Sequence, residues 1–191
     1  FTFTGQLKLS WMDPRNAFDP IVAGVEEETY SGDFQFNELS TSWYPQLSLL
    51  NEAEHYEENA ILVKIQPDGE TTIFRSINAS AKTHMDLTHY PFDNQKLQLI
   101  FGAFGYDTDR INLVADDIHF SSNDLVEKPE EYSFDKMSYS SGTIDAGILG
   151  SDKLSSTFIV DIDLTRKPGF VLRTVILPML LVVFLTFSVF W

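Results

Sequence analysis

Apolar and polar residues alternate in short runs along most of this chain, the two-residue period of strands buried on one face. Residues 6–11 place Leu7, Leu9 and Trp11 on the same face. Residues 157–164 alternate most regularly, with aspartates between the apolar positions. We expect strands at both places and another at 96–101.

A turn sequence, Pro67-Asp68-Gly69, joins two further predicted strands, 60–65 and 71–74. Proline fixes φ at the first corner and glycine supplies a positive φ at the last. This pattern predicts a β-hairpin.

The remaining segments before the C-terminus indicate no amphipathic helix. Residues 20–32 and the Ser- and Gly-rich residues 138–156 are expected to be loops. Short strands separated by turns are typical of a β-sandwich or a barrel.

The chain ends on a different pattern, a run without charge from Thr174 to Trp191 in which only Thr174, Thr186 and Ser188 are polar. Its length meets the ~18–20 residues that cross a bilayer core, and membrane helices tolerate a proline such as Pro178. A membrane-spanning helix is expected, with a buried core helix or strand pair as the alternative. Arg166, Lys167 and Arg173 lie at its start, which by charge alone would place that end in the cytoplasm.

Composition excludes several classes of function. The net charge of −15 excludes a basic surface for nucleic acid. The acidic residues would attract cations, or they simply form a solvated surface. The chain has no cysteine, so it has neither a disulfide nor a thiolate site. It lacks the G-x-S-x-G, P-loop and dinucleotide motifs, so no enzyme is expected, although a glycosidase carboxylate pair stays open because its separation is spatial.

Acidic pairs could serve as calcium ligands, since calcium takes carboxylate oxygens. The candidates are Asp107 with Asp109 and Asp116 with Asp117. Neither pair has EF-hand spacing, and a solvated turn is the alternative. We expect no cofactor other than Ca²⁺ as a possible modulator, and no other metal site.

Several motifs in order resemble the pentameric ligand-gated ion channels, the Cys-loop receptor superfamily. The segment 88–95, T-H-Y-P-F-D-N-Q, is similar to the core of the Cys-loop, and Thr83 and Leu97 stand where animal receptors have its two cysteines. Their absence is typical of the prokaryotic members. The other matching motifs are Trp11-Met12-Asp13-Pro14-Arg15, Trp43-Tyr44-Pro45 with Asn51 (loop A), Phe104-Gly105-Tyr106-Asp107 (loop B), and Arg166-Lys167-Pro168-Gly169-Phe170 with Pro178 (first membrane helix).

The resemblance implies an all-β immunoglobulin-like sandwich over residues 1–166, an extracellular or periplasmic ligand-binding domain, followed by the first transmembrane helix over 167–191. It implies a homopentamer in a bacterial inner membrane, multi-pass in the full chain, gated by an unknown small molecule or ion. The family's N-terminal helix and first strand would precede Phe1, and three more membrane helices would follow Trp191. Cation permeability is a further expectation. This orientation is opposite to that implied by the basic cluster.

The resemblance also assigns coupling residues. Tyr90, Pro91 and Phe92 would form an apolar tip against the membrane helices, and Pro178 lies in the first of them. Asp93 would pair with Arg166, since a guanidinium can hold a carboxylate by two bonds, and would transmit motion to the pore. A purely structural staple is the alternative.

The agonist pocket of the family is an aromatic box between two subunits, which binds ammonium groups through ring faces. Phe104 is the best candidate for a ligand contact. Leu50 replaces the loop A aromatic, and a single aromatic makes a poor cage, so we expect that small amine transmitters are not the agonist. The other candidates are Tyr106, Asp107, Tyr139 at the base of loop C, and Gln6 from the neighbouring subunit.

The remaining motif residues are expected to be structural. Trp11, Asp13 and Arg15 would stiffen a strand end, and Trp43 and Pro45 would belong to the core. Two other functions stay open: a single-pass sensor or adhesion domain without a pore, and a membrane-anchored sugar-processing enzyme.

Overall fold

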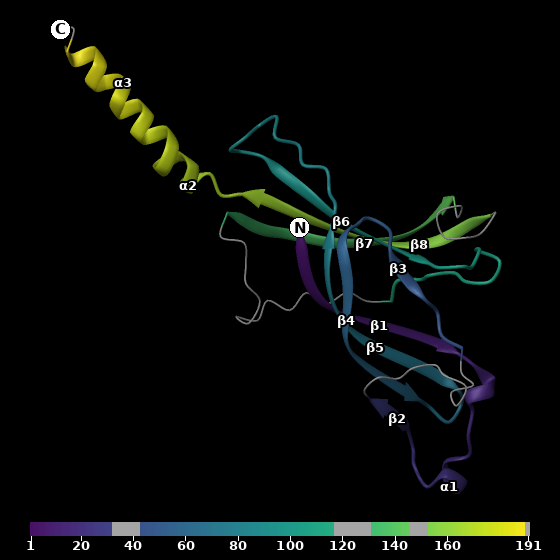
Figure 1. Cartoon of the computed structure of the whole chain (residues 1–191). Helices are drawn as coiled ribbons and strands as arrows, with labels where there is room; N and C mark the ends of the chain where they lie inside the picture. The colour runs from purple at the N-terminus through teal and green to yellow at the C-terminus, as the bar shows by residue number, and fades with distance from the viewer. Residues whose placement is uncertain (32–42, 117–130, 146–152, 190–191) are drawn as a thin grey trace.

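The computed structural model describes residues 1–31, 43–116, 131–145 and 153–189, without the side chains of 55–60. These residues form two four-stranded sheets and one long C-terminal helix (Figure 1). The prediction of an all-β sandwich followed by an apolar helix is confirmed.

The first sheet has the strand order β1-β5-β4-β2 and is antiparallel throughout. Its β4–β5 hairpin is the predicted one, and Gly69 at its turn has φ 92°. A Cβ there would lie 2.5 Å from the carbonyl oxygen of Asp13, so only glycine fits. The strands are β1 (Thr2–Met12), β2 (Glu28–Ser31), β4 (Glu52–Ile65) and β5 (Glu70–Ala81).

The second sheet has the order β3-β6-β8-β7 and is also antiparallel. Its strands are β3 (Leu47–Leu49), β6 (Asn94–Ala103), β7 (Tyr132–Asp145) and β8 (Leu154–Arg166).

The two expected loops are wrong in part. Of residues 138–156, the first part belongs to β7 and the last to β8, and 146–152 lie outside the described residues. Serine and glycine interrupt the apolar alternation by which β7 could have been recognised, but its backbone pairs with β8 from Tyr132 to Asp145. Residues 20–32 contain the short helix α1 (Pro20–Ala23), capped by Asp19, and the edge strand β2.

The core lies between the sheets, where alternate residues of the strands meet. Ile77 of β5 and Phe101 of β6 belong to one buried cluster that links both sheets, and a second cluster surrounds Ile73 at the far end of the first sheet. Fully removing such side chains from water stabilises the fold by about 1.5–3 kcal/mol each.

The segment after β1 contains the first expected structural motif. The carboxylate of Asp13 accepts hydrogen bonds from Arg15 Nε at 2.9 Å and Nη2 at 2.7 Å, and from its backbone N–H at 3.1 Å. These bonds cap a 3₁₀ turn (Pro14–Asn16), and the Arg15 side chain holds the pKa of the Asp13 carboxyl below its usual value. Trp11, on the core-facing side of β1, is half-buried.

The C-terminal helix continues the chain directly from β8 and projects away from both sheets (Figure 1). It comprises α2 (Gly169–Val171), a π-helical turn (Leu172–Ile176) and α3 (Leu177–Val189). Its span of Gly169–Val189 is long and apolar enough to cross a membrane. Because no side chain of this span is buried, the buried-core alternative does not hold for it; Trp191 lies outside the described residues.

Pro178 is the second residue of α3, just after the π-helical turn. Proline has no N–H for a helical bond and its ring crowds the carbonyl four residues earlier. The wider π turn before it accommodates both effects.

Candidate functional site

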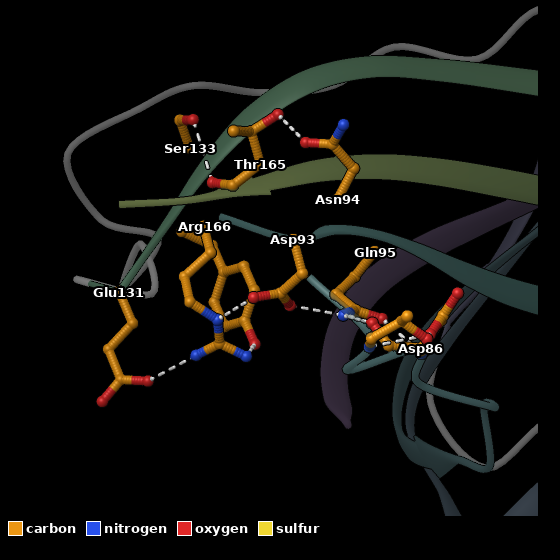
Figure 2. Close-up of polar contacts among 10 residues, drawn as sticks. Asp86, Asp93, Asn94, Gln95, Glu131, Ser133, Thr165 and Arg166 are labelled. Carbon is orange, nitrogen blue, oxygen red and sulfur yellow. Dashed lines mark hydrogen bonds and ion pairs between the residues drawn. The ribbon is translucent and has the colours of Figure 1, made fainter. Parts of the chain in front are cut away.

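The candidate site lies where the sandwich meets the helix. Asp93 stands just before β6, Arg166 ends β8, and Glu131 and Tyr132 lie at the start of β7. Figure 2 shows the guanidinium of Arg166 between the carboxylates of Asp93 and Glu131. The antiparallel register brings these three strand ends together, only a few residues before α2.

Asp93 and Arg166 form a buried ion pair. Arg166 Nε donates to Asp93 Oδ1 at 2.8 Å. The side chain of Arg166 is 9% exposed and that of Asp93 is 2% exposed. The backbone N–H of Arg166 also donates to the carbonyl oxygen of Asp93 at 3.1 Å. The guanidinium holds the pKa of the Asp93 carboxyl below its usual value, and Asp93 raises the pKa of Arg166. Both groups are therefore charged at neutral pH.

Two aromatic rings enclose the Arg166 guanidinium. Its central carbon lies 5.0 Å from the ring centre of Tyr90 and 4.5 Å from that of Tyr132. Nη2 donates to the Tyr132 hydroxyl, and Nη1 lies 3.5 Å from an oxygen of Glu131. A buried charge needs such partners, and here Arg166 obtains them from two separate segments of the chain, the loop that contains Tyr90 and Asp93 and the residues Glu131 and Tyr132.

The other oxygen of Asp93 is held by Gln95. Gln95 Nε2 donates to Asp93 Oδ2 at 2.5 Å and to the carbonyl oxygen of Asp86 at 2.7 Å. Its Oε1 accepts from the backbone N–H of Asp86 at 3.1 Å (Figure 2). Both carboxylate oxygens of Asp93 are thus engaged.

The loop before Asp93 has the exposed aromatic tip that the sequence suggests. Tyr90 is 50% and Phe92 is 63% exposed, whereas Pro91, after a cis peptide bond, is buried. The arrangement ties an apolar loop and the strand leading into the helix to one ion pair. A displacement of either element relative to the other must strain or break that pair.

The expected agonist residues lie on several elements and form no common site within this chain. Gln6 is exposed on β1 of the first sheet, Phe104 is 48% exposed after β6, and Tyr139 is 45% exposed on β7, with its ring 6.4 Å from that of Phe158. Leu50 is half-buried in the turn after β3, and its N–H donates to the carbonyl of Ile100.

Tyr106 and the loop A residues have packing contacts. The Tyr106 hydroxyl accepts a hydrogen bond from Trp43 Nε1 at 2.7 Å. Trp43 is half-buried and also packs edge to face against Trp11, and Pro45 is buried.

The possible calcium ligands are engaged differently. Lys153 Nζ lies 2.5 Å from Asp109 Oδ2 and 3.8 Å from Asp107 Oδ2. Asp116 is exposed, and Asp117 lies outside the described residues. Within the described part of the chain no three acidic or histidine side chains gather at a metal-binding distance. The structure therefore gives the calcium hypothesis no support, because the ammonium group of Lys153 already contacts both carboxylates of the first pair.

Three contributors to the junction were missed. Tyr132 begins the edge strand β7, which its polar composition made hard to recognise, and Glu131 precedes it; no local pattern marks either residue. Gln95 belongs to the recognised segment 88–95, but the sequence assigns it no partner; its place one strand period after Asp93 was the available signal.

Comparisons with known proteins identify the family of this chain. Residues 1–168 match the sequence model of the neurotransmitter-gated ion-channel ligand binding domain. The chain belongs to this family. The family confirms a ligand-gated channel domain in place of an enzyme, and the absence of cysteine fits the type that lacks the Cys-loop disulfide.

Curated relatives of this ligand-binding domain include bacterial and animal channels. A proton-gated ion channel of Gloeobacter violaceus is 28% identical over all of this chain and 50% of its own length. The neuronal acetylcholine receptor subunit beta-3 of Gallus gallus is 26% identical over 97% of this chain and 39% of its own. Subunit alpha-6 of Rattus norvegicus is 27% identical, covering 97% and 36%. The chain spans half or less of the length of these relatives.

Proposed function

We propose that this chain is the ligand-sensing part of one subunit of a homopentameric, cation-permeable channel in a bacterial inner membrane. Residues 1–166 are the extracellular domain and 167–191 the first membrane helix. Because the chain spans half or less of its relatives, the pore is assigned to further sequence of the full-length protein. The family match supports this proposal, and the buried Asp93–Arg166 pair carries it.

The pair is the coupling element of the proposal. It joins the apolar loop, whose tip at Tyr90 and Phe92 is exposed for contact with other membrane helices, to the strand that continues into α2. An agonist shifts the closed–open equilibrium only by its different affinity for the two states. The ion pair converts that difference into a force on the first helix.

The sensing site is assigned to the interface between neighbouring subunits. Phe104 is exposed just after β6 and Tyr139 on β7, both at the second sheet, whereas Gln6 is exposed on β1 of the first sheet. One subunit would therefore present the first two and its neighbour the third. A pocket built this way exists only in the assembled pentamer.

Protons and acetylcholine are the first agonists to test, because the relatives are named for them. The structure favours protons, since the loop B and loop C positions contribute only Phe104 and Tyr139 as exposed rings and the chain has a surplus of carboxylates. An aromatic cage for an ammonium group needs several rings.

Current recording from the full-length protein in planar bilayers tests this function. The solution facing the β domain is acidified, and acetylcholine is applied separately. We expect pentamers whose current rises on acidification and reverses near the cation equilibrium potential. A monomer or a silent pentamer would instead support the alternative, a single-pass sensor or adhesion domain.

A further inference from the structure

Gln95 is a buried residue at the centre of the junction, and neither the family match nor the ion pair assigns a role to its side chain. It is 3% exposed on β6. Its amide binds both backbone groups of Asp86 and one carboxylate oxygen of Asp93, so its oxygen and its nitrogen are both used. One side chain therefore holds the two ends of the loop from residue 86 to residue 93.

The loop has no covalent closure. The chain contains no cysteine, and the outer ends of the segment are joined by a bond of 3.1 Å, from Thr83 Oγ1 to the carbonyl oxygen of Lys96. The three bonds of Gln95 lie inside this one, next to the ion pair. Because the amide contacts the backbone of Asp86, the closure is independent of the side chain at that position.

The same amide fixes the direction of the Asp93 carboxylate. Arg166 binds Oδ1 and Gln95 binds Oδ2, so the group cannot rotate without losing a charge-assisted bond. Without Gln95, Oδ2 would be a buried oxygen with one partner fewer, which is costly.

We propose that Gln95 is a positioning residue: its amide closes the loop from 86 to 93 and orients Asp93 toward Arg166. This inference rests on the proposed function of the junction. It makes an uncharged side chain part of the coupling element, and it requires that Gln95 act through Asp93.

The charged and titratable groups around Gln95 determine the effect of substitutions at this position. Asp93 is paired with Arg166 of β8, and Arg166 in turn contacts Tyr132 of β7, Glu131 just before β7, and Tyr90 of the loop. On the other side of Gln95 lies Asp86, whose carboxylate is influenced by His84 and His89. A carboxylate at position 95 would thus meet the carboxylate of Asp93 directly, on the side away from Arg166.

Two substitutions separate the possible roles. Gln95→Met keeps the volume and removes all three bonds. Gln95→Glu keeps the length, loses both N–H donors and repels Asp93 at neutral pH. At acidic pH the protonated carboxyl group introduced at position 95 would again donate to Asp93, so this variant gains a pH dependence that a loss of packing would not produce.

The strand offers a matched control in Gln98. Its Nε2 donates to Asp161 Oδ1 at 2.7 Å, a similar amide–carboxylate bond on the same strand. Asp161 is paired with Lys96 and not with the loop. Gln98→Glu therefore repeats the change in charge and chemistry away from the junction.

The experiment uses the full-length protein and two readouts. The first is activation by whichever of protons and acetylcholine opens the wild type, and the second is thermal unfolding in detergent at several pH values. Both Gln95 variants are expected to shift half-activation about five- to tenfold, the scale of an ordinary coupling between sites, and Gln98→Glu is expected to leave it near wild type. Gln95→Met should add little once Asp93→Asn is present, and acid should narrow the stability difference between Gln95→Glu and wild type.

Independent, multiplying effects of Gln95→Met and Asp93→Asn would overturn the positioning role, as would Gln95 variants that gate like Gln98→Glu. If the wild type carries no current with either stimulus, the proposed channel function fails. The inference is then decided by thermal unfolding of Gln95→Met, Asp93→Asn and the double variant. Non-additive unfolding of the same two variants would then support a Gln95–Asp93 unit, and additive unfolding would reject it.

Discussion

The indole N–H of Trp43 donates a hydrogen bond to the hydroxyl of Tyr106 at 2.7 Å, and the two rings meet edge to face with centroids 5.7 Å apart. Trp43 meets Trp11 of β1 in the same way, at 6.2 Å. These contacts connect β1 of the first sheet with the segment before β3 and the segment after β6. Tyr106, a candidate ligand contact by its place in the motif, thus has its polar group engaged within its own subunit.

Tyr106→Phe tests whether that hydroxyl has a structural role. Removing a satisfied, half-buried hydrogen bond should lower the free energy of unfolding by about 1 kcal/mol and leave agonist sensitivity unchanged. Tyr139→Phe, at an exposed tyrosine, is the matched control and should change stability by less than about 0.5 kcal/mol. Urea unfolding and dose–response curves measure the two effects. A larger change in agonist sensitivity than in stability would place Tyr106 in the binding site instead.

Asn51 joins the two sheets by its side chain. Nδ2 donates to the carbonyl oxygens of Lys82 at 2.9 Å and Gln98 at 2.7 Å, and Oδ1 accepts from the N–H of Ile100 at 3.1 Å. Asn51→Asp removes both donors and should cost about 1–3 kcal/mol.

Asn94→Asp is the matched control for this substitution. Asn94 uses its oxygen as acceptor for Thr165 Oγ1, and aspartate retains that acceptor. Urea unfolding of both variants gives the comparison. Equal losses of stability would show that Asn51 does not join the sheets in the way described.

The pH dependence of stability should contain a contribution from Asp93. Arg166, and then Gln95, hold the pKa of the folded carboxyl below its usual value near 3.8. A lowered folded pKa gives stability that is complete above the unfolded value and is lost as pH falls through the folded one. Asp93 is thus already ionised at mildly acidic pH, and proton activation there requires other groups.

Acid unfolding followed by circular dichroism measures this contribution. Asp93→Asn should be less stable than wild type at neutral pH, and the difference should shrink only below about pH 4. Asp116→Asn, at an exposed aspartate, controls for the change in net charge. A difference that already shrinks between neutral pH and about pH 5 would contradict the lowered pKa.

The sequence predicts those parts of this fold in which local chemistry determines the structure. The Pro67-Asp68-Gly69 turn, the alternating strand at 157–164 and the apolar terminal run all appear as expected, because each carries its own periodic or backbone signal. The strand β7 was missed because its pairing depends on the backbone of β8 and not on its own side chains.

Only part of the candidate site could be predicted from the sequence. The motif resemblance suggested Asp93 and Arg166, and the structure contains their ion pair. Tyr132 contacts Arg166 across a long separation in sequence, and Gln95 binds the backbone of Asp86, so neither contact has a local pattern. Long-range register creates the first of these contacts, and the path of the loop creates the second.

Charge reversal at the ion pair tests the central claim most directly. Asp93→Arg and Arg166→Asp, alone and together, are introduced into the full-length protein, and currents are normalised to the number of pentamers in the membrane. Each single change places like charges together and should shift half-activation at least about tenfold or abolish current. The double reversal should recover part of the response; recovery is incomplete because the rings of Tyr90 and Tyr132 favour a cation at position 166, where the double variant has a carboxylate. A double variant no better than the more impaired single one would contradict a direct coupling role for the pair.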